Sequence, residues 1–332
     1  MKSIDKLCAL FFWIPVFTGL TTSVVLAAAA GWQPGRNVEL IVSTSPGSGS
    51  DTTARFIQKL LTEKKLVEAS IVVINKPGGQ GTIGLAYLNQ HAGNGHYLLI
   101  TSPSLLANHI MGRTSIHFSD TTPLAQLGAE PVLFTVRADS PIKTGRDLAE
   151  RLKTNPDALS FSIGTTIGSH NHIAVALLAK AVGGNPQTLK VVAFSGSADG
   201  ITALLGGHIS VAGAPASGVW EHVVAGKLRT IAVSGEQRLG GPLSNVPTWK
   251  ELGLPVVSSN WRSIVGPKGL LGEQTRYWDS VFGRLSKLPE WKQSLDSEHM
   301  ENTYSDSRGT RELMEARYRA MSTTLAELGL VK

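Results

Sequence analysis

The residue types that could bind a ligand stand together near the start of the chain, in a loop of glycine, serine and aspartate. Residues 40–42 before the loop are apolar and predict a buried strand, and the apolar spacing from residue 54 predicts a helix. Between them lie Gly47, Ser48, Gly49, Ser50 and Asp51. A helix that begins after such a loop offers free N–H groups and the positive end of its dipole, so the loop is a general anion site.

The same order of strand, small-residue loop and helix recurs twice, and another serine-containing loop follows the strand predicted over 97–101. The recurrences run from strand 159–163 to helix 173–182 and from strand 189–194 to helix 201–205. In α/β sheets, ligands gather at the carboxyl ends of the strands. We therefore expect one cleft that binds a small carboxylate, with contributions from Ser102, Ser104, Gly164, Thr165, Gly168, Ser169, His172, Ser195 and Gly196.

Two motifs resemble cofactor sites but lack part of what such sites need. Residues 79–84 fit the dinucleotide pattern G-x-G-x-x-G, yet no acidic residue stands between Glu68 and Asp120 to hold a ribose. The sequence His170-Asn171-His172 could bind a metal, but no carboxylate is close and the histidines do not share a helix face. We expect no cofactor and no metal, and His172 could equally be a packing residue.

A secreted hydrolase is the alternative function. Asp51 could act there as a general base, and Ser197 as a nucleophile. However, Ser197 stands one place off the G-x-S-x-G pattern of a nucleophile elbow. A carboxylate near a helix start also usually caps the helix rather than taking part in catalysis. We expect a binding protein without catalytic residues, with the hydrolase as its rival.

The N-terminus has the layout of a secretory signal peptide over residues 1–30. Lys2 and Lys6 precede an apolar run over 7–20, and alanines follow at 27–30. An uncleaved membrane anchor is the alternative, although the alanines favour cleavage. The single cysteine, Cys8, lies inside this segment, so the mature protein would contain none. We expect a periplasmic protein.

The rest of the chain alternates strands with helices, which predicts an α/β fold on a mainly parallel sheet. A length of 332 residues allows two lobes. We expect lobe one to comprise 31–130 plus 240–332 and lobe two 131–239, with a glycine- and proline-rich connection over 235–247. The net charge of +6 comes without a long run of basic residues, so we expect no nucleic-acid partner.

Short motifs along residues 31–332 together resemble one family. They are Glu39–Val42 with Pro46–Asp51, Asn75–Gly79 with Gly81 and Gly84, Gly95–Leu99 with Asn108, Gly168, Ser169 and His172, Ala203–Ile209, Gly226–Arg229, Val246–Thr248 and Glu251–Gly253. These motifs are similar to those of the Bug family, the extracytoplasmic solute receptors of tripartite tricarboxylate transporters. Citrate-binding TctC proteins belong to the same group.

The resemblance implies a two-lobed periplasmic-binding-protein fold of the Venus-flytrap, type II kind, with the ligand between the lobes. It implies that Gly47, Gly49, Ser50 and Asp51 of one loop, and Gly164, Gly168, Ser169 and His172 of another, clasp a ligand carboxylate. Ser48 replaces a glycine of the family pattern, and Gly213 and Ala214 stand where relatives place Asp or Asn. The expected partners are a large and a small permease subunit, and we expect the receptor to be a monomer.

Overall fold

Residues 31–331, apart from 165, 195 and 196, are described by a computed structural model. The signal peptide predicted over 1–30 and the predicted ligand-binding residues Thr165, Ser195 and Gly196 lie outside these described residues. Among the helices of the described part, none has the length and apolar character needed to cross a membrane.

The first sheet has five strands in the order β2-β1-β3-β10-β4, and it is mixed rather than mainly parallel as predicted. β1 (Val38–Val42) pairs in parallel with β2 (Ile71–Asn75) and with β3 (Tyr97–Thr101). β10 (Ser259–Pro267) runs antiparallel to both β3 and β4 (Thr121–Pro131). The prediction of a mainly parallel sheet was wrong here because a local pattern can indicate a strand but not the direction in which a strand from a distant part of the chain enters the sheet.

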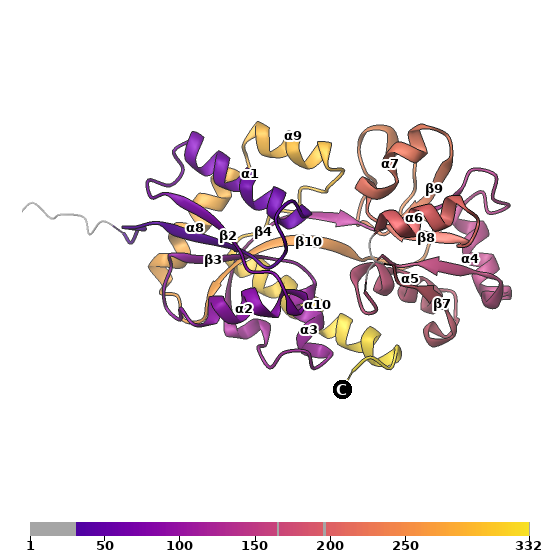
Figure 1. Cartoon of the computed structure of the whole chain (residues 1–332), viewed down its shortest axis with the longest axis horizontal. Helices are drawn as coiled ribbons and strands as arrows, with labels where there is room; N and C mark the ends of the chain where they lie inside the picture. Colours follow the sequence, from indigo (N-terminus) through magenta and orange to yellow (C-terminus); the bar gives the residue numbers. More distant parts are fainter. Residues whose placement is uncertain (1–30, 165, 195–196, 332) are drawn as a thin grey trace, which may run out of the picture. The chain divides into compact units, whose positions relative to one another are not determined.

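Helices cover both faces of this first sheet (Figure 1). α1 (Gly49–Glu63) and α8 (Gly272–Leu285) pack on one face, in a core shared with β1, β3 and β10. α2 (Thr82–Asn89), α3 (Ser104–Ile110) and α10 (Ser307–Glu327) supply the core of the other face. The carboxyl end of β1 thus delivers the chain directly to the start of α1.

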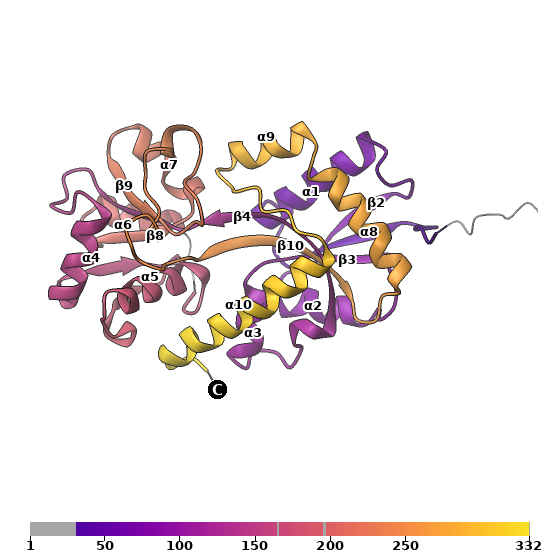
Figure 2. The same cartoon turned by 180° about the vertical axis from the view of Figure 1, so that it is seen from behind.

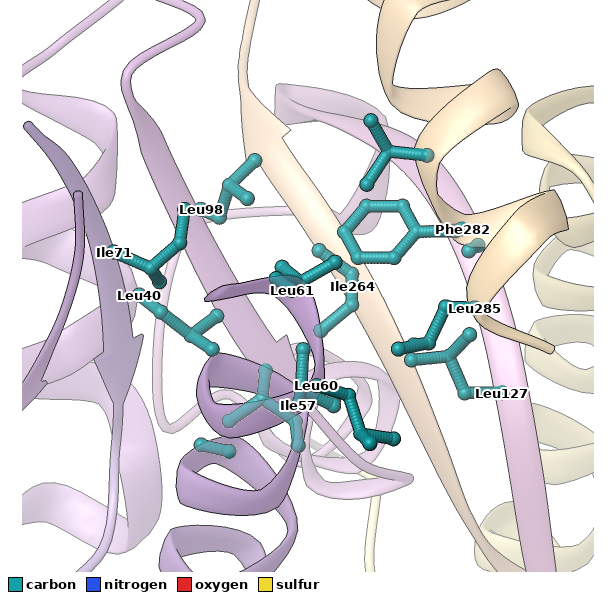
Figure 3. Close-up of a cluster of buried hydrophobic side chains, with 14 of the residues drawn as sticks. Leu40, Ile57, Leu60, Leu61, Ile71, Leu98, Leu127, Ile264, Phe282 and Leu285 are labelled. Atoms are coloured by element: carbon teal, nitrogen blue, oxygen red, sulfur yellow. The ribbon is translucent and has the colours of Figure 1, made fainter. Parts of the chain in front are cut away.

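The apolar stripe of α1 anchors that helix to the sheet. Ile57, Leu60 and Leu61 are buried at helical spacing, and Figure 3 shows them between Leu40 of β1 and Phe282 of α8. α9 (Pro289–Ser297) adds the buried Trp291 to the same core. This packing fixes the position of the helix N-terminus at Gly49.

The second sheet also has five strands, in the order β7-β6-β8-β5-β9. β6 pairs in parallel with β7 and β8, whereas β5 pairs antiparallel with β8 and β9. The strands are β5 (Leu133–Arg137), β6 (Ser160–Ser162), β7 (Lys190–Val192), β8 (Val211–Ala214) and β9 (Leu228–Val233). The two sheets therefore repeat one plan, in which two parallel pairs are followed by two antiparallel ones.

Helices cover both faces of the second sheet as well (Figure 2). α4 (Gly145–Thr154) and α5 (His170–Ala181) pack on one face. α6 (Ser197–Leu205) and α7 (Ala216–Val224) pack on the other. α5 and α6 begin earlier than the starts predicted at 173 and 201, which brings their first turns closer to the preceding loops.

β4 is the longest strand of the first sheet, and the sequence analysis did not predict it. It contains Pro123, Gln126, Gly128 and Glu130, residue types that are not enriched in strands. The segment is extended because β10 pairs with it along its whole length. Tertiary pairing, not local propensity, determines this strand.

Buried Ser234 joins the segments that connect the two sheets. Only Val132 separates β4 from β5, and its N–H donates to Ser234 Oγ at 2.9 Å. The Ser258 N–H, just before β10, donates to the Ser234 carbonyl at 3.0 Å. Trp249 and Val256 still pack in the core of the second sheet. The division into lobes at 131 and 240 stays a prediction.

Candidate functional site

The first predicted loop forms a capped helix start. Ser48 is the N-cap of α1, and its Oγ accepts a hydrogen bond from the Asp51 N–H at 3.4 Å. The Ser48 hydroxyl also lies 2.6 Å from Thr44 Oγ1. Gly47 has a φ of +79°, a conformation that glycine adopts without strain. N–H groups in the first turn of a helix lack intrahelical acceptors, so those of α1 can bind an anion.

Asp51 is a structural carboxylate within this loop. It is only 2% exposed, and its oxygens accept hydrogen bonds from the Gly47 N–H at 2.8 Å, Asn75 Nδ2 at 2.9 Å and Arg55 Nε at 2.9 Å. The bond from Arg55, with those from Gly47 and Asn75, lowers the pKa of Asp51 to about 2 against the opposing effect of burial. A carboxylate held ionised in this way is a poor general base, so the geometry does not favour the hydrolase.

The serines after β3 lie beside the loop that follows β2. Ser102 Oγ and Ser104 Oγ are 3.0 Å apart. A β-carbon placed on Gly81 would lie 3.2 Å from Ser43 Oγ and 3.8 Å from Ser104 Oγ. The ends of β1, β2 and β3 are therefore brought together at one edge of the sheet, as parallel strands require.

The second predicted loop also ends in a serine-capped helix. Ser169 is the N-cap of α5, and its Oγ accepts from the His172 N–H at 3.3 Å and donates to the Ile163 carbonyl at 3.3 Å. His172 Nδ1 accepts from the Gly168 N–H at 3.0 Å, and burial lowers the pKa of His172 to about 4. The neutral imidazole thus holds the loop in place, which matches the packing role left open for it.

Gly164 and Gly168 give this loop its shape. Both have positive φ, +73° and +83°, and the Gly164 carbonyl accepts from the Phe194 N–H at 2.8 Å. The Ile167 carbonyl accepts a hydrogen bond from Arg113 Nη2 at 3.4 Å, which ties the loop to the segment after α3. The loop of the second sheet therefore contacts residues of the first.

Arg262 on β10 lies against the start of α1 and acts electrostatically on the start of α5, and no sequence pattern had indicated it. It is buried, with 7% exposure, and its Nη2 lies 3.2 Å from where a β-carbon on Gly49 would be. Burial, and then the charge of Arg262, lower the pKa of His170, the first residue of α5, to about 3. The available signal was an arginine two positions before an apolar strand segment, Ile264 to Pro267.

A cavity of about 330 Å³ lies on the opposite face of β10, against α5 and α10. Trp261 lines it, and Arg317 of α10 stacks on the Trp261 ring with Cζ 5.6 Å from the ring centre. Glu301 also lines this cavity, and burial raises the pKa of Glu301 to about 7. The described residues of the predicted loops do not line the cavity, except at Pro103, between Ser102 and Ser104, and at His170.

Glu301→Gln is expected to make stability less dependent on pH. Since the pKa of Glu301 is raised in the folded protein, its stabilising effect is complete below about pH 4.5 and is lost as the pH rises through about 7. Near pH 8 the variant should be more stable than the wild type by roughly 2 kcal/mol. Thermal unfolding between about pH 4.5 and 8 measures the difference in stability, and the exposed Glu315→Gln is the control. Profiles of stability against pH that run parallel for wild type and Glu301→Gln would contradict the expectation.

The fold is that of periplasmic binding proteins. A TctC solute-binding protein from Polaromonas has the same fold, with a TM-score of 0.78 at 29% identity over 89% of this chain and 99% of that chain. A protein from R. palustris, solved with adipate, has a TM-score of 0.73 at 24% identity over 90% and 99% of the two chains. The predicted two-lobed α/β fold class is confirmed.

The sequence comparisons then identify the family. The model of the tripartite tricarboxylate transporter family receptor matches residues 53–330, so the chain belongs to this family of periplasmic solute-binding receptors. BugT of Bordetella pertussis is 27% identical to this chain over 254 residues, 75% of this chain and 76% of that protein. The predicted resemblance to Bug and TctC proteins is confirmed.

Proposed function

We propose that the chain is exported by its signal peptide and captures a small carboxylate in the periplasm for the two permease subunits of a tripartite transporter. The observation that carries this proposal is the pair of serine-capped helix starts, at Ser48 and Ser169, with buried Arg262 beside the first and its charge acting on His170 of the second. Helix N-termini and a guanidinium all favour a carboxylate. The R. palustris neighbour that was solved with adipate supports the same ligand class.

The remaining predicted features belong to the same proposal. The ligand lies between two lobes, 31–130 with 240–332 and 131–239, and the receptor acts as a monomer without catalysis. The ligand-binding residues are those of the two capped loops, Ser102 and Ser104, and the predicted residues outside the described part. Two lobes that each contribute a loop would close on the ligand by a hinge motion.

A thermal-shift screen tests the proposal. Adipate, malate and citrate should each be compared with a neutral amide of the same acid. A ligand present at a hundred times its dissociation constant stabilises the folded protein by about 2.7 kcal/mol, whereas a hydrolase would consume an ester or amide. Turnover of such substrates, or no stabilisation by any carboxylate, would contradict the proposed function.

Ser169→Ala is expected to weaken carboxylate binding roughly tenfold, because a hydroxyl at the helix start is removed. The hydroxyl acts through the loop that it holds, since its one proton is donated to the Ile163 carbonyl. The variant should still fold, since the loss of an N-cap serine costs about 1 kcal/mol. Thr144→Ala removes an equivalent cap from α4, where Thr144 Oγ1 accepts from the Asp147 N–H at 3.1 Å, and serves as the control. Unchanged affinity of Ser169→Ala in calorimetry would count against a role in binding.

A further inference from the structure

Arg262 is a buried cation whose guanidinium is nearly unpartnered by the described part of the protein. Its Nε has no hydrogen-bond partner there, and its Nη1 reaches only the Asn260 carbonyl, at 3.5 Å. No carboxylate of the described residues lies within 4.0 Å of it, the limit for an ion pair. A buried charge without a partner is costly, so this site calls for an anion.

The acidic groups around Arg262 do not supply that anion. Glu130 and Glu298 are near enough to influence it electrostatically, but neither forms an ion pair with it. Burial raises the pKa of both carboxyl groups, so each is a weaker counter-ion than an exposed carboxylate. Arg317, on the other side of the strand, differs because it donates to Gln126 Oε1 and stacks on Trp261.

The position of Arg262 connects it with both capped helices. Asn260 and Arg262 alternate with Trp261 along β10, so their side chains leave the face that Trp261 occupies. Nη2 approaches Gly49, the first residue of the fifteen-residue helix α1, and no side chain at Gly49 covers that edge of the guanidinium. The positive charge also acts on His170, the first residue of the twelve-residue helix α5.

We propose that Arg262 is the direct counter-ion of the bound solute, and that its guanidinium pairs with the ligand carboxylate held at the starts of α1 and α5. The inference rests on the proposed function and adds the residue that makes recognition ionic. Loop N–H groups and hydroxyls also bind neutral oxygens, whereas a buried guanidinium selects an anionic, planar group. The site therefore binds the amide of an acid much more weakly than the acid itself.

The test combines a change in the protein with a change in ligand charge. Calorimetry and thermal shift compare adipate with neutral adipamide on the wild type, Arg262→Gln, Arg262→Lys and the control Arg317→Gln. We expect Arg262→Gln to lower adipate affinity roughly ten- to a hundredfold, and Arg262→Lys to restore part of it. The small effect of adipamide should be the same in all four proteins.

Equal loss of adipate and adipamide binding in Arg262→Gln would overturn the inference, because it would mean a merely structural role. Retention of adipate affinity within about threefold, or an equal loss in Arg317→Gln, would overturn it as well. If Arg262→Gln does not fold, Gly49→Ala gives an independent measurement. The added methyl group would crowd Nη2 of Arg262 and should weaken adipate binding. Unchanged adipate binding in Gly49→Ala would overturn the inference. Failure of the wild type to bind adipate, malate or citrate would overturn the proposed function instead, and the inference with it.

Discussion

Asp51→Ala is expected to lower the free energy of unfolding by about 3 kcal/mol. The carboxylate is buried and joins the loop, β2 and α1 through Gly47, Asn75 and Arg55. Its removal leaves the Gly47 N–H without its acceptor and takes from the Asn75 amide one of its two acceptors, the other being the Thr44 carbonyl. Urea unfolding at neutral pH measures the loss, and carboxylate binding should weaken with it because Ser48 and Gly49 lose their support.

The loss of stability caused by Asp51→Ala should become smaller as the pH falls. The pKa of Asp51 is lowered to about 2 in the folded protein, so its ionised form stabilises the fold above the ordinary pKa of 3.8. That stabilisation is lost as the pH falls toward 2, and wild type and variant should converge there. A difference that stays constant down to that pH would contradict this account.

Asp147→Ala provides the matched control for Asp51→Ala. Asp147 also lies in the first turn of a helix and accepts the Lys143 and Thr144 N–H groups at 2.9 and 3.0 Å, but it is only partly buried. Water can reach a partly buried acceptor and replace it, so the loss of stability should be clearly smaller. Equal losses at the two positions would mean that burial of Asp51 is irrelevant.

Gly168→Ala is expected to cost roughly 2–3 kcal/mol of unfolding free energy and to displace the second loop. The residue has a φ of +83°, and an added β-carbon would lie 2.7 Å from Met111 Sδ. Met111 is itself buried, so its side chain cannot move away freely. Chemical unfolding measures the cost, and the Ser169 hydroxyl should shift with the loop.

Gly183→Ala separates the two causes of the cost of Gly168→Ala, which are backbone strain at positive φ and the clash with Met111. Gly183 also has a φ of +83°, but nothing lies within 4 Å of its added β-carbon. Its substitution should therefore show only the backbone strain, about 1–2 kcal/mol. In a Met111→Ala background, Gly168→Ala should cost no more than this; a full cost there would rule out the contact with Met111.

Local sequence was sufficient for the elements whose signals lie within a few residues. The apolar run of β1, the helical spacing of Ile57, Leu60 and Leu61, and the capping serines at 48 and 169 correspond to what the structure contains. These features depend on apolar spacing within one element and on cap side chains that bond to backbone N–H groups a few residues away. The family resemblance rested on the same short motifs, and it carried the fold class correctly.

Asp51 and His172 show how far local sequence reaches within the site. Both were predicted as ligand-binding residues, with structural readings beside them, and in the structure their polar atoms serve the loops. Sequence types could not decide between these roles. The partners of Asp51, Asn75 above all, come from other elements, so only the folded arrangement shows which hydrogen bonds are already made.

The sequence by itself determined the strand–loop–helix units, their caps and the class of protein. Only the tertiary structure decided that β4 is a strand, that β10 runs antiparallel between β3 and β4, and that Arg262 meets Gly49 and acts on His170. The physical reason is separation along the chain. A buried charge and a paired strand both owe their energy to partners more than a hundred residues away, which no local pattern encodes.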